Sequence, residues 1–194
     1  MNALRLAALS LLLAAPGLTL ADGPPARLPG TRALKVSAGL GMVAASDQGG
    51  VPVNGTGEGL YASAEYVLRP SSWFSPRLYG GLLLTRAAND CGAQPCDVSA
   101  RYVFGGAKAR LLAPIPWVAP FIELGVGLSL GHFTTRSGTL VDVDKAGSTY
   151  HWPFSIGVAL GARRQYEVAL AYLFHPQQSQ FSGGITFGYQ LDLD

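Results

Sequence analysis

The sequence is poor in charge. Asp, Glu, Lys and Arg together make up 13% of its 194 residues, about half the usual share of roughly 25% in soluble domains. The net charge is only +2 and the basic residues form no cluster, so nothing in the sequence favours nucleic acid as a partner. Hydrophobic residues nevertheless reach 48%. With so few charges, an ordinary water-facing exterior is difficult to build.

Long hydrophobic runs are lacking as well. After residue 21 no stretch approaches the ~18 consecutive apolar residues that a membrane-spanning helix needs. Low charge without a long apolar run is typical of a membrane β-barrel, because the apolar residues of its strands alternate with small or polar ones and escape a hydropathy window. The length is sufficient for one such domain.

Cysteine is scarce too. The two cysteines, Cys91 and Cys96, enclose four residues. Two thiols without a neighbouring His make a poor metal site, whereas in an exported protein such a pair most simply forms a disulfide. A ring this small would stabilise its own loop rather than the whole domain. We therefore expect a disulfide, no metal and no cofactor.

The first 21 residues have the features of a secretory signal. Arg5 is followed by a short apolar stretch, and small residues before Asp22 suit cleavage at that point. An uncleaved helical anchor is the alternative. Residues 22–33 are a lead-in rich in Pro and Gly without periodicity, and residues 34–194 are expected to form the folded domain.

The stretch Phe121 to Gly131 shows the alternation most clearly. Every second residue from Ile122 to Leu130 is a bulky aliphatic, whereas the positions between them hold Glu123, glycines and Ser129. Successive side chains of a strand point to opposite faces, so one face is wholly apolar and the other is small or polar. The small face suits the crowded interior of a narrow barrel, which leaves lipid as the partner of the apolar face.

The same alternation recurs in eight segments of roughly ten residues, the length at which a tilted strand crosses a bilayer. The expected strands are residues 34–44, 59–69, 77–87, 100–111, 121–131, 150–163, 166–175 and 183–193. The connections alternate between polar loops and shorter turns rich in Pro, Trp or Arg, the asymmetry expected of outer loops and periplasmic turns. Because unpaired backbone groups are costly in lipid, the first strand must pair with the eighth. The predicted fold is an all-β, eight-stranded antiparallel up-and-down transmembrane barrel with both ends periplasmic.

This pattern, most evident in PFIELGVGLSLG (120–131) and SGGITFGYQLDL (182–193), resembles the small eight-stranded outer-membrane barrels of Gram-negative bacteria, the OmpA-like and OmpW-like group. The resemblance covers the chain after the signal. It implies localisation in the cell outer membrane, contact with outer-membrane lipid and lipopolysaccharide, insertion by the barrel-assembly machinery, and a monomer.

Inward-facing charges are the first candidate site. An eight-stranded lumen is just wide enough for side chains to fill, and buried charges must be paired. We therefore expect a salt-bridged plug, with a conducting pore as the alternative. Its predicted members are Lys35, Glu65, Lys108, Arg110, Glu123 and Glu167.

Three aromatic residues, Trp73, Phe74 and Trp117, fall in the short turns. At one common end of the barrel they would form a periplasmic aromatic girdle at the membrane interface. In the third strand, Leu83 disturbs the expected alternation.

Two histidines, His132 and His151, flank the predicted loop at 132–149. We expect them near each other on the outer rim, as solvated residues or, as the alternative, in a metal site.

His175 raises the question of catalysis, because Ser179 follows it and Glu167 precedes it on the same strand. Outer-membrane lipid A deacylases are also eight-stranded barrels and use a Ser-His-acid set, in which the base activates the serine. In those enzymes the corresponding stretch looks like His-x-Ser-Asn. This chain instead has Pro176 after the histidine, a different serine spacing and no Asn. We therefore expect no catalytic residues.

The functional prediction is a non-enzymatic outer-membrane barrel with a structural or surface-interaction role and a largely filled lumen. The alternatives are a narrow channel for small or apolar solutes, a lipid A deacylase-like enzyme, and a secreted lipocalin-like ligand binder. A lipocalin would turn its apolar face inward and carry charges outside.

Overall fold

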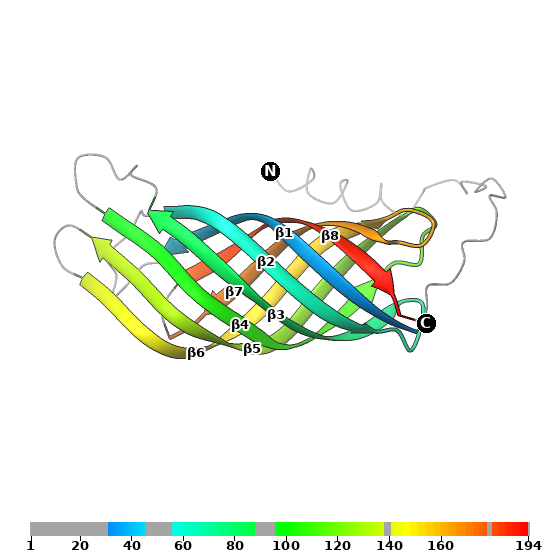
Figure 1. Cartoon of the computed structure of the whole chain (residues 1–194), viewed down its shortest axis with the longest axis horizontal. Helices are drawn as coiled ribbons and strands as arrows, with labels where there is room; N and C mark the ends of the chain where they lie inside the picture. The colour runs from blue at the N-terminus through cyan, green and yellow to red at the C-terminus, as the bar shows by residue number, and fades with distance from the viewer. Residues whose placement is uncertain (1–30, 46–55, 88–95, 138–140, 178–179, 194) are drawn as a thin grey trace, which may run out of the picture.

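A computed structural model describes residues 31–45, 56–87, 96–137, 141–177 and 180–193. Within these ranges the chain forms one closed antiparallel barrel in which each strand pairs with its neighbours in sequence and β1 pairs with β8 (Figure 1). The predicted eight-stranded barrel is confirmed. The strands are β1 Arg32–Ala45, β2 Thr56–Leu68, β3 Phe74–Ala87, β4 Cys96–Leu112, β5 Val118–Ser137, β6 Val141–Leu160, β7 Tyr166–His175 and β8 Gln180–Asp192.

The barrel has two distinct ends. At the turn end, short connections join β2 to β3, β4 to β5 and β6 to β7. The start of β1 and the end of β8 meet there too, with Ala33 opposite Asp192 (Figure 1). The other four connections lie at the opposite end, the loop end, and they contain the internal residues outside the described ranges. The predicted signal, residues 1–21, also lies outside the described residues.

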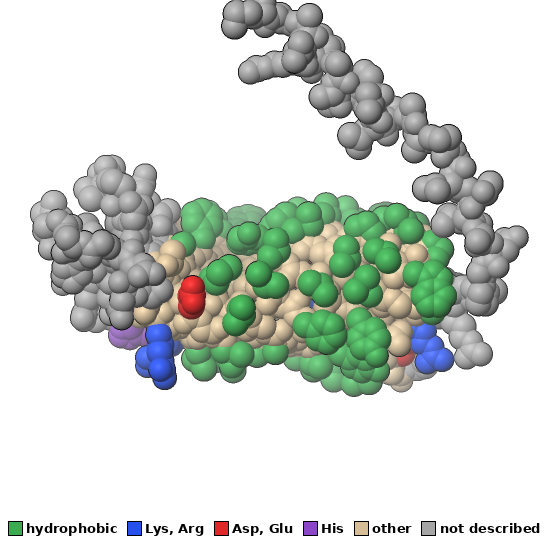
Figure 2. Space-filling view, turned by 90° about the horizontal axis from the view of Figure 1, so that it is seen from above, with side chains coloured by type: hydrophobic (Ala, Val, Ile, Leu, Met, Phe, Trp, Pro, Cys, Tyr) green, Lys and Arg blue, Asp and Glu red, His purple; other side chains and the backbone are tan. Residues whose placement is uncertain are grey.

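The outer surface of the barrel is apolar. In β7 exposed and buried residues alternate without interruption, and every exposed member of that strand is a Tyr, Val, Leu or Phe. Figure 2 shows hydrophobic side chains over the barrel body and charged side chains near its two ends. The apolar face thus points outward, the reverse of a lipocalin, so the lipocalin-like alternative is wrong.

Aromatic residues mark both edges of this apolar surface. Near the loop end Phe174 stacks on Phe181, with ring centroids 4.8 Å apart, and Trp152 lies opposite Phe174. Near the turn end Tyr166 packs against Tyr189 at 5.4 Å. The eight-residue step from Tyr166 to Phe174 spans about 20 Å along the barrel axis, for a rise of ~3.4 Å per residue and a tilt of ~40°. This height is close to the apolar band of roughly 25 Å in outer-membrane barrels.

The predicted loop at residues 132–149 is wrong. β5 and β6 stay paired over the described residues of this stretch, out to Ser137 opposite Val141. Its polar composition suggested a loop, but Phe133, Thr135 and Val143 continue a strand pattern, and aromatic and β-branched residues favour pleated structure. Polarity alone does not distinguish a loop from a strand that has passed beyond the apolar surface.

The alternation of β3 is intact, contrary to the expectation for Leu83. This side chain is fully buried and lies on the inner face together with Tyr79 and Thr85. It packs among the aromatic residues of the interior. The inner face of β3 therefore includes one bulky aliphatic residue. The sequence analysis expected only small or polar residues at inward positions, so it did not assign Leu83 to this face.

Replacing Val126 by Lys tests whether the outer surface faces lipid. Val126 lies about midway along the outer surface of β5 and is 56% exposed. In phospholipid vesicles we expect Val126→Lys to lower the free energy of unfolding by about 2–4 kcal/mol, because the ammonium must enter hydrocarbon. Urea titration measures this loss. The control Ile115→Lys places the same charge in the β4–β5 turn and should cost less than about 1 kcal/mol. Equal small losses would contradict a lipid-facing surface.

Candidate functional site

Two layers of side chains fill the barrel interior. The layer nearer the turn end is ionic and comes from six of the eight strands. We call it the ion layer, and its members are Lys35, Glu65, Arg77, Lys108, Arg110, Glu123 and Glu167. Toward the loop end lies the aromatic layer, consisting of Tyr61, Tyr79, Tyr102, Phe104, Phe133, His151 and His175.

Glu65 is one centre of the ion layer. Its Oε1 accepts from Lys35 Nζ at 3.0 Å and from Lys108 Nζ at 2.9 Å. Its Oε2 accepts from Arg77 Nη1 at 2.9 Å. Three cations on three different strands thus converge on one carboxylate that is almost completely buried. Because a buried charge is tolerated only when paired, this convergence ties β1, β3 and β4 to β2.

Arg110 is the second centre. Its Nη1 and Nη2 donate to the two carboxylate oxygens of Glu167 at 2.6 and 2.7 Å, and its Nε donates to Glu123 Oε1 at 2.7 Å. The guanidinium also lies over the Phe121 ring, 3.5 Å from its centroid. Such a bidentate, charge-assisted pair is strong and directional. Lys35 and Lys108 link the two centres, to Glu167 at 2.8 Å and to Glu123 at 2.7 Å.

The structure therefore brings all six predicted lumen charges into one network. It adds a seventh, Arg77, which the sequence analysis missed. The expected strand began at residue 77, directly after Pro76, so its first residue was not assigned to a face. Its parity with Tyr79 and Gly81 is the signal that would have placed it inside. With Arg77 included, the ion layer has four cations and three carboxylates.

Very little space remains between the ion layer and Tyr61. A cavity of about 10 Å³ lies there, lined by Lys35, Glu65, Lys108 and their neighbours. A cavity needs roughly 10–15 Å³ of this kind of volume to hold a single water molecule. This cavity between the described side chains therefore has room for about one water molecule at most.

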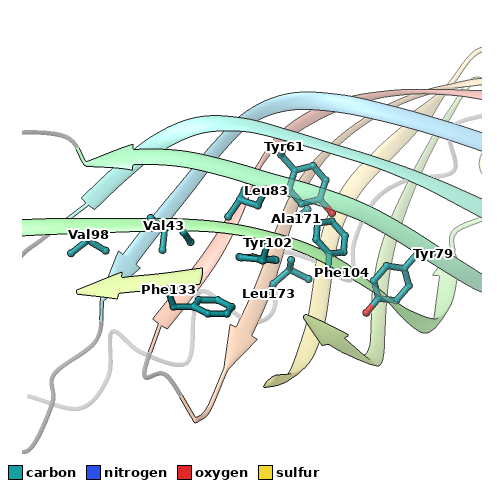
Figure 3. Packing of buried hydrophobic residues seen from close by; sticks show 11 residues of the cluster. Val43, Tyr61, Tyr79, Leu83, Val98, Tyr102, Phe104, Phe133, Ala171 and Leu173 are labelled. Atoms are coloured by element: carbon teal, nitrogen blue, oxygen red, sulfur yellow. The ribbon is translucent and has the colours of Figure 1, made fainter. Parts of the chain in front are cut away.

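The aromatic layer is a second set of buried side chains that pack against one another inside the barrel. Figure 3 shows its tyrosine and phenylalanine rings projecting into the barrel from several strands. Tyr102 stacks on Phe133 with centroids 5.0 Å apart, and the His175 ring lies edge-on to Tyr102 at 5.2 Å. Tyr61 and Phe104 contact each other at 5.4 Å. Pairs at these distances add to the stability gained by burying the rings.

A chain of hydrogen bonds runs through this layer, which we call the histidine relay. Tyr79 Oη contacts His151 Nε2 at 2.6 Å, and Ser129 Oγ lies between His151 Nδ1 at 2.9 Å and His175 Nε2 at 3.0 Å. Ser182 Oγ then contacts His175 Nδ1 at 3.5 Å and also Tyr102 Oη.

The six groups of the relay can all be satisfied with both imidazoles neutral. If Tyr79 donates to His151, the histidine donates to Ser129, and each later group donates to the next. Reversing every donor gives an equally complete chain, because a hydroxyl and a neutral imidazole can each donate one proton and accept another. Gly127 makes room for this arrangement, since a Cβ there would collide with Tyr79 Oη.

The histidines are not placed as predicted. His132 is exposed on the outer face of β5, whereas His151 is buried on the inner face of β6. They do not share a rim, because the described residues of the expected loop between them form paired strands. Among the described residues, no three His, Cys, Asp or Glu side chains are grouped so that they could hold a metal ion.

The residues considered for a deacylase are not brought together. His175 faces the lumen, where Ser129 and Ser182 contact its two ring nitrogens. Glu167 lies in the ion layer and is held by Arg110 and Lys35. Ser179 lies outside the described residues.

The remaining predicted site residues are partly described. Trp73 and Trp117 are exposed at the turn end, and Phe74 packs against Trp73 with centroids 5.8 Å apart. Their role as an interfacial girdle stays a prediction. Cys96 begins β4, but Cys91 lies outside the described residues, so the disulfide also stays a prediction.

Comparison with solved structures finds outer-membrane proteins. Neisserial surface protein A aligns with a TM-score of 0.55 at 13% identity, over 84% of this chain and 98% of that one. The fold is that of a small outer-membrane β-barrel. The N-terminal β-barrel domain of Pseudomonas aeruginosa OprF aligns at 0.48 and 8% identity, over 84% and 99%. The outer-membrane enzyme PagL aligns at 0.47 and 12%, over 82% and 99%.

No protein-family model and no curated protein sequence matches the chain. At the identities of the structural neighbours, the likeness shows the fold alone.

Removing Arg110 tests the ion layer. Arg110→Met leaves the carboxylates of Glu123 and Glu167 without their main partner, and we expect the free energy of unfolding to fall by about 3–5 kcal/mol. Adding Glu167→Gln removes one of the two carboxylates left unpaired, and it should recover at least ~1 kcal/mol of the free energy of unfolding. The control Arg163→Met changes an exposed turn residue and should cost no more than about 0.5 kcal/mol. Urea titration of the three variants measures these values, and a loss for Arg110→Met no larger than the control would refute the coupling.

Removing the Ser129 hydroxyl tests the histidine relay. Ser129→Ala leaves one nitrogen of each histidine without a partner in the buried layer, which should cost about 1–3 kcal/mol. The matched control is Ser155→Ala on β6, a buried serine to which the described residues supply no side-chain hydrogen bond. Thermal or urea unfolding of both variants separates the two cases. Similar losses would mean that the relay adds nothing to stability.

Proposed function

We propose that this protein is a non-enzymatic outer-membrane barrel with a sealed lumen. Its role in this proposal is structural or lies in surface interactions made by the connections at the loop end. The apolar outer surface, with aromatic residues at both edges, supports insertion into a bilayer. The filled interior supports the absence of transport.

The proposed orientation places the turn end in the periplasm and the loop end outside the cell. Outer-membrane barrels have short periplasmic turns and longer outer connections, and here three short turns share one end with the start of β1 and the end of β8. In this proposal a signal at residues 1–21 directs export. The barrel-assembly machinery inserts the chain as a monomer among outer-membrane lipid and lipopolysaccharide.

The observation that carries the proposal is that two layers of buried side chains, the ion layer and the aromatic layer, lie one after the other in the lumen. The ion layer leaves a cavity of only about 10 Å³ next to Tyr61. The aromatic layer follows on the side of the loop end. A narrow channel would require both layers to open. Opening the ion layer would separate buried charges, which costs several kcal/mol for each ion left unpaired.

The histidine relay also supports a non-enzymatic role. Its Ser–His contacts lie on the inner face of the barrel, among aromatic side chains. A lipid ester outside the barrel could not reach Ser129 without crossing the wall. The described residues place no carboxylate on either histidine.

Conductance in a planar bilayer tests the sealed lumen. We expect the purified protein to add no steady current above the background of the protein-free bilayer, because neither layer leaves a water-filled path. A general porin inserted under the same conditions confirms that the assay detects an open barrel. Protease protection in matched vesicles verifies that the protein has inserted. Stable, reproducible current steps from inserted protein would overturn the proposal in favour of the channel.

A further inference from the structure

The turn end of the barrel opens into a cavity separate from the closed part of the lumen. Its volume is about 470 Å³, within the usual range of roughly 300–1,000 Å³ for small-molecule sites. We call it the vestibule. The β2–β3 turn and Arg164 of the β6–β7 turn form its walls, and Arg77, Arg110 and Gln190 contribute from the inner face of the barrel.

Cationic groups dominate the vestibule. Four arginines line it, Arg69, Arg77, Arg110 and Arg164, against one carboxylate, Glu167. That carboxylate already accepts hydrogen bonds from Nη1 and Nη2 of Arg110 and forms an ion pair with Lys35. Asp192 accepts from Arg69 at 2.9 Å.

The charges of the vestibule and the ion layer do not balance. Counting the described side chains that line the vestibule or form its ion pairs, six are cationic and four are carboxylates. Among the described side chains, two positive charges are therefore in excess. The cations are Lys35, Arg69, Arg77, Lys108, Arg110 and Arg164, and the carboxylates are Glu65, Glu123, Glu167 and Asp192.

Buried polar atoms also remain without partners here. Arg77 Nε and Gln190 Oε1 make no hydrogen bond with the described residues, although both side chains are more than nine-tenths buried. A buried donor or acceptor without a partner costs about 1–3 kcal/mol. Both residues line the vestibule, so a ligand could satisfy these atoms.

Arg164 occupies its place at some conformational cost. Its φ is 54°, in the left-handed region where Gly or Asn is cheaper. The side chain reaches across the mouth and donates to Ser72 O at 3.4 Å. Burial and the nearby Arg69 guanidinium both lower the pKa of Arg164 from its ordinary value. An anion between these arginines would relieve that repulsion.

We propose that the vestibule binds a small organic phosphate monoester. A dianion matches the excess of two positive charges, and phosphate oxygens fit the fork of an arginine. The volume exceeds what a bare phosphate fills, and Trp73, Phe74 and Leu112 supply an apolar wall for the organic part. This inference does not depend on the sealed lumen or on which side of the membrane the turn end faces.

The test uses phenyl phosphate as the probe and the full chain in detergent micelles. Trp117→Phe and Trp152→Phe leave Trp73, which lines the vestibule, as the fluorescent reporter. At mildly alkaline pH the monoester is a dianion, and chloride keeps the ionic strength constant. We expect saturable binding. Benzoate has the same ring with one charge and should bind at least about tenfold more weakly.

The deciding variant is Arg164→Gly. It removes the guanidinium but relaxes the backbone at φ 54°, so a loss of binding does not reflect a damaged turn. We expect the dissociation constant to rise about tenfold or more. The matched control is Arg163→Gly, which alters the exposed neighbour and should change it less than about twofold. Heat-modifiable mobility, a difference in gel migration between unheated and heated samples, confirms that both variants are folded.

The outcomes are distinct. Equal binding by wild type and Arg164→Gly, or no saturable binding at all, would overturn the site. Equal binding of benzoate would overturn the dianion assignment. Phosphatidic acid in the micelles identifies the source of the phosphate, because competition with phenyl phosphate would indicate a lipid headgroup and its absence a soluble monoester.

Discussion

Closure of the sheet by β1 and β8 is the constraint on which the rest of this structure depends. Eight strands fix a narrow interior, and every inward side chain must fit within it. Glycine, alanine and serine therefore occupy many inner positions, and large residues are admitted only where small ones face them. Gly127 opposite His151 shows this on adjacent strands, because any side chain at Gly127 would displace the Tyr79 hydroxyl.

The ion layer holds the strands together across this crowded interior. Each carboxylate contacts cations from more than one strand, and Arg110 holds Glu123 of β5 and Glu167 of β7 together. Replacing such a network by apolar residues could give equal stability, so stability alone does not explain it. Its structural effect is to fill one level of the lumen with four cations and three carboxylates, of which Arg77, Arg110 and Glu167 line the vestibule at the turn end.

Much of this could be predicted from residue parity. Alternation placed Lys35, Glu65 and Glu123 on the inner face and predicted eight strands. The cost of unpaired backbone groups in lipid predicted closure. It could not say which inner residues meet across the lumen, because that depends on how far the strands are staggered when the barrel closes. Arg77 was missed at a predicted strand boundary. His151 was assigned to a rim because the polar residues 132–149 suggested a loop.

The extension of β5 and β6 has a consequence for the outer part of the molecule. On its β7 side, β6 is first paired at Trp152, although it begins at Val141. Above that level, among the described residues, backbone N–H and C=O groups on one side of β6 have no strand partner. A sheet that β1 and β8 close into a barrel thus has, among the described residues, a strand edge without a partner at its loop end. An unpaired strand edge of this kind is a place where another strand can add to a sheet.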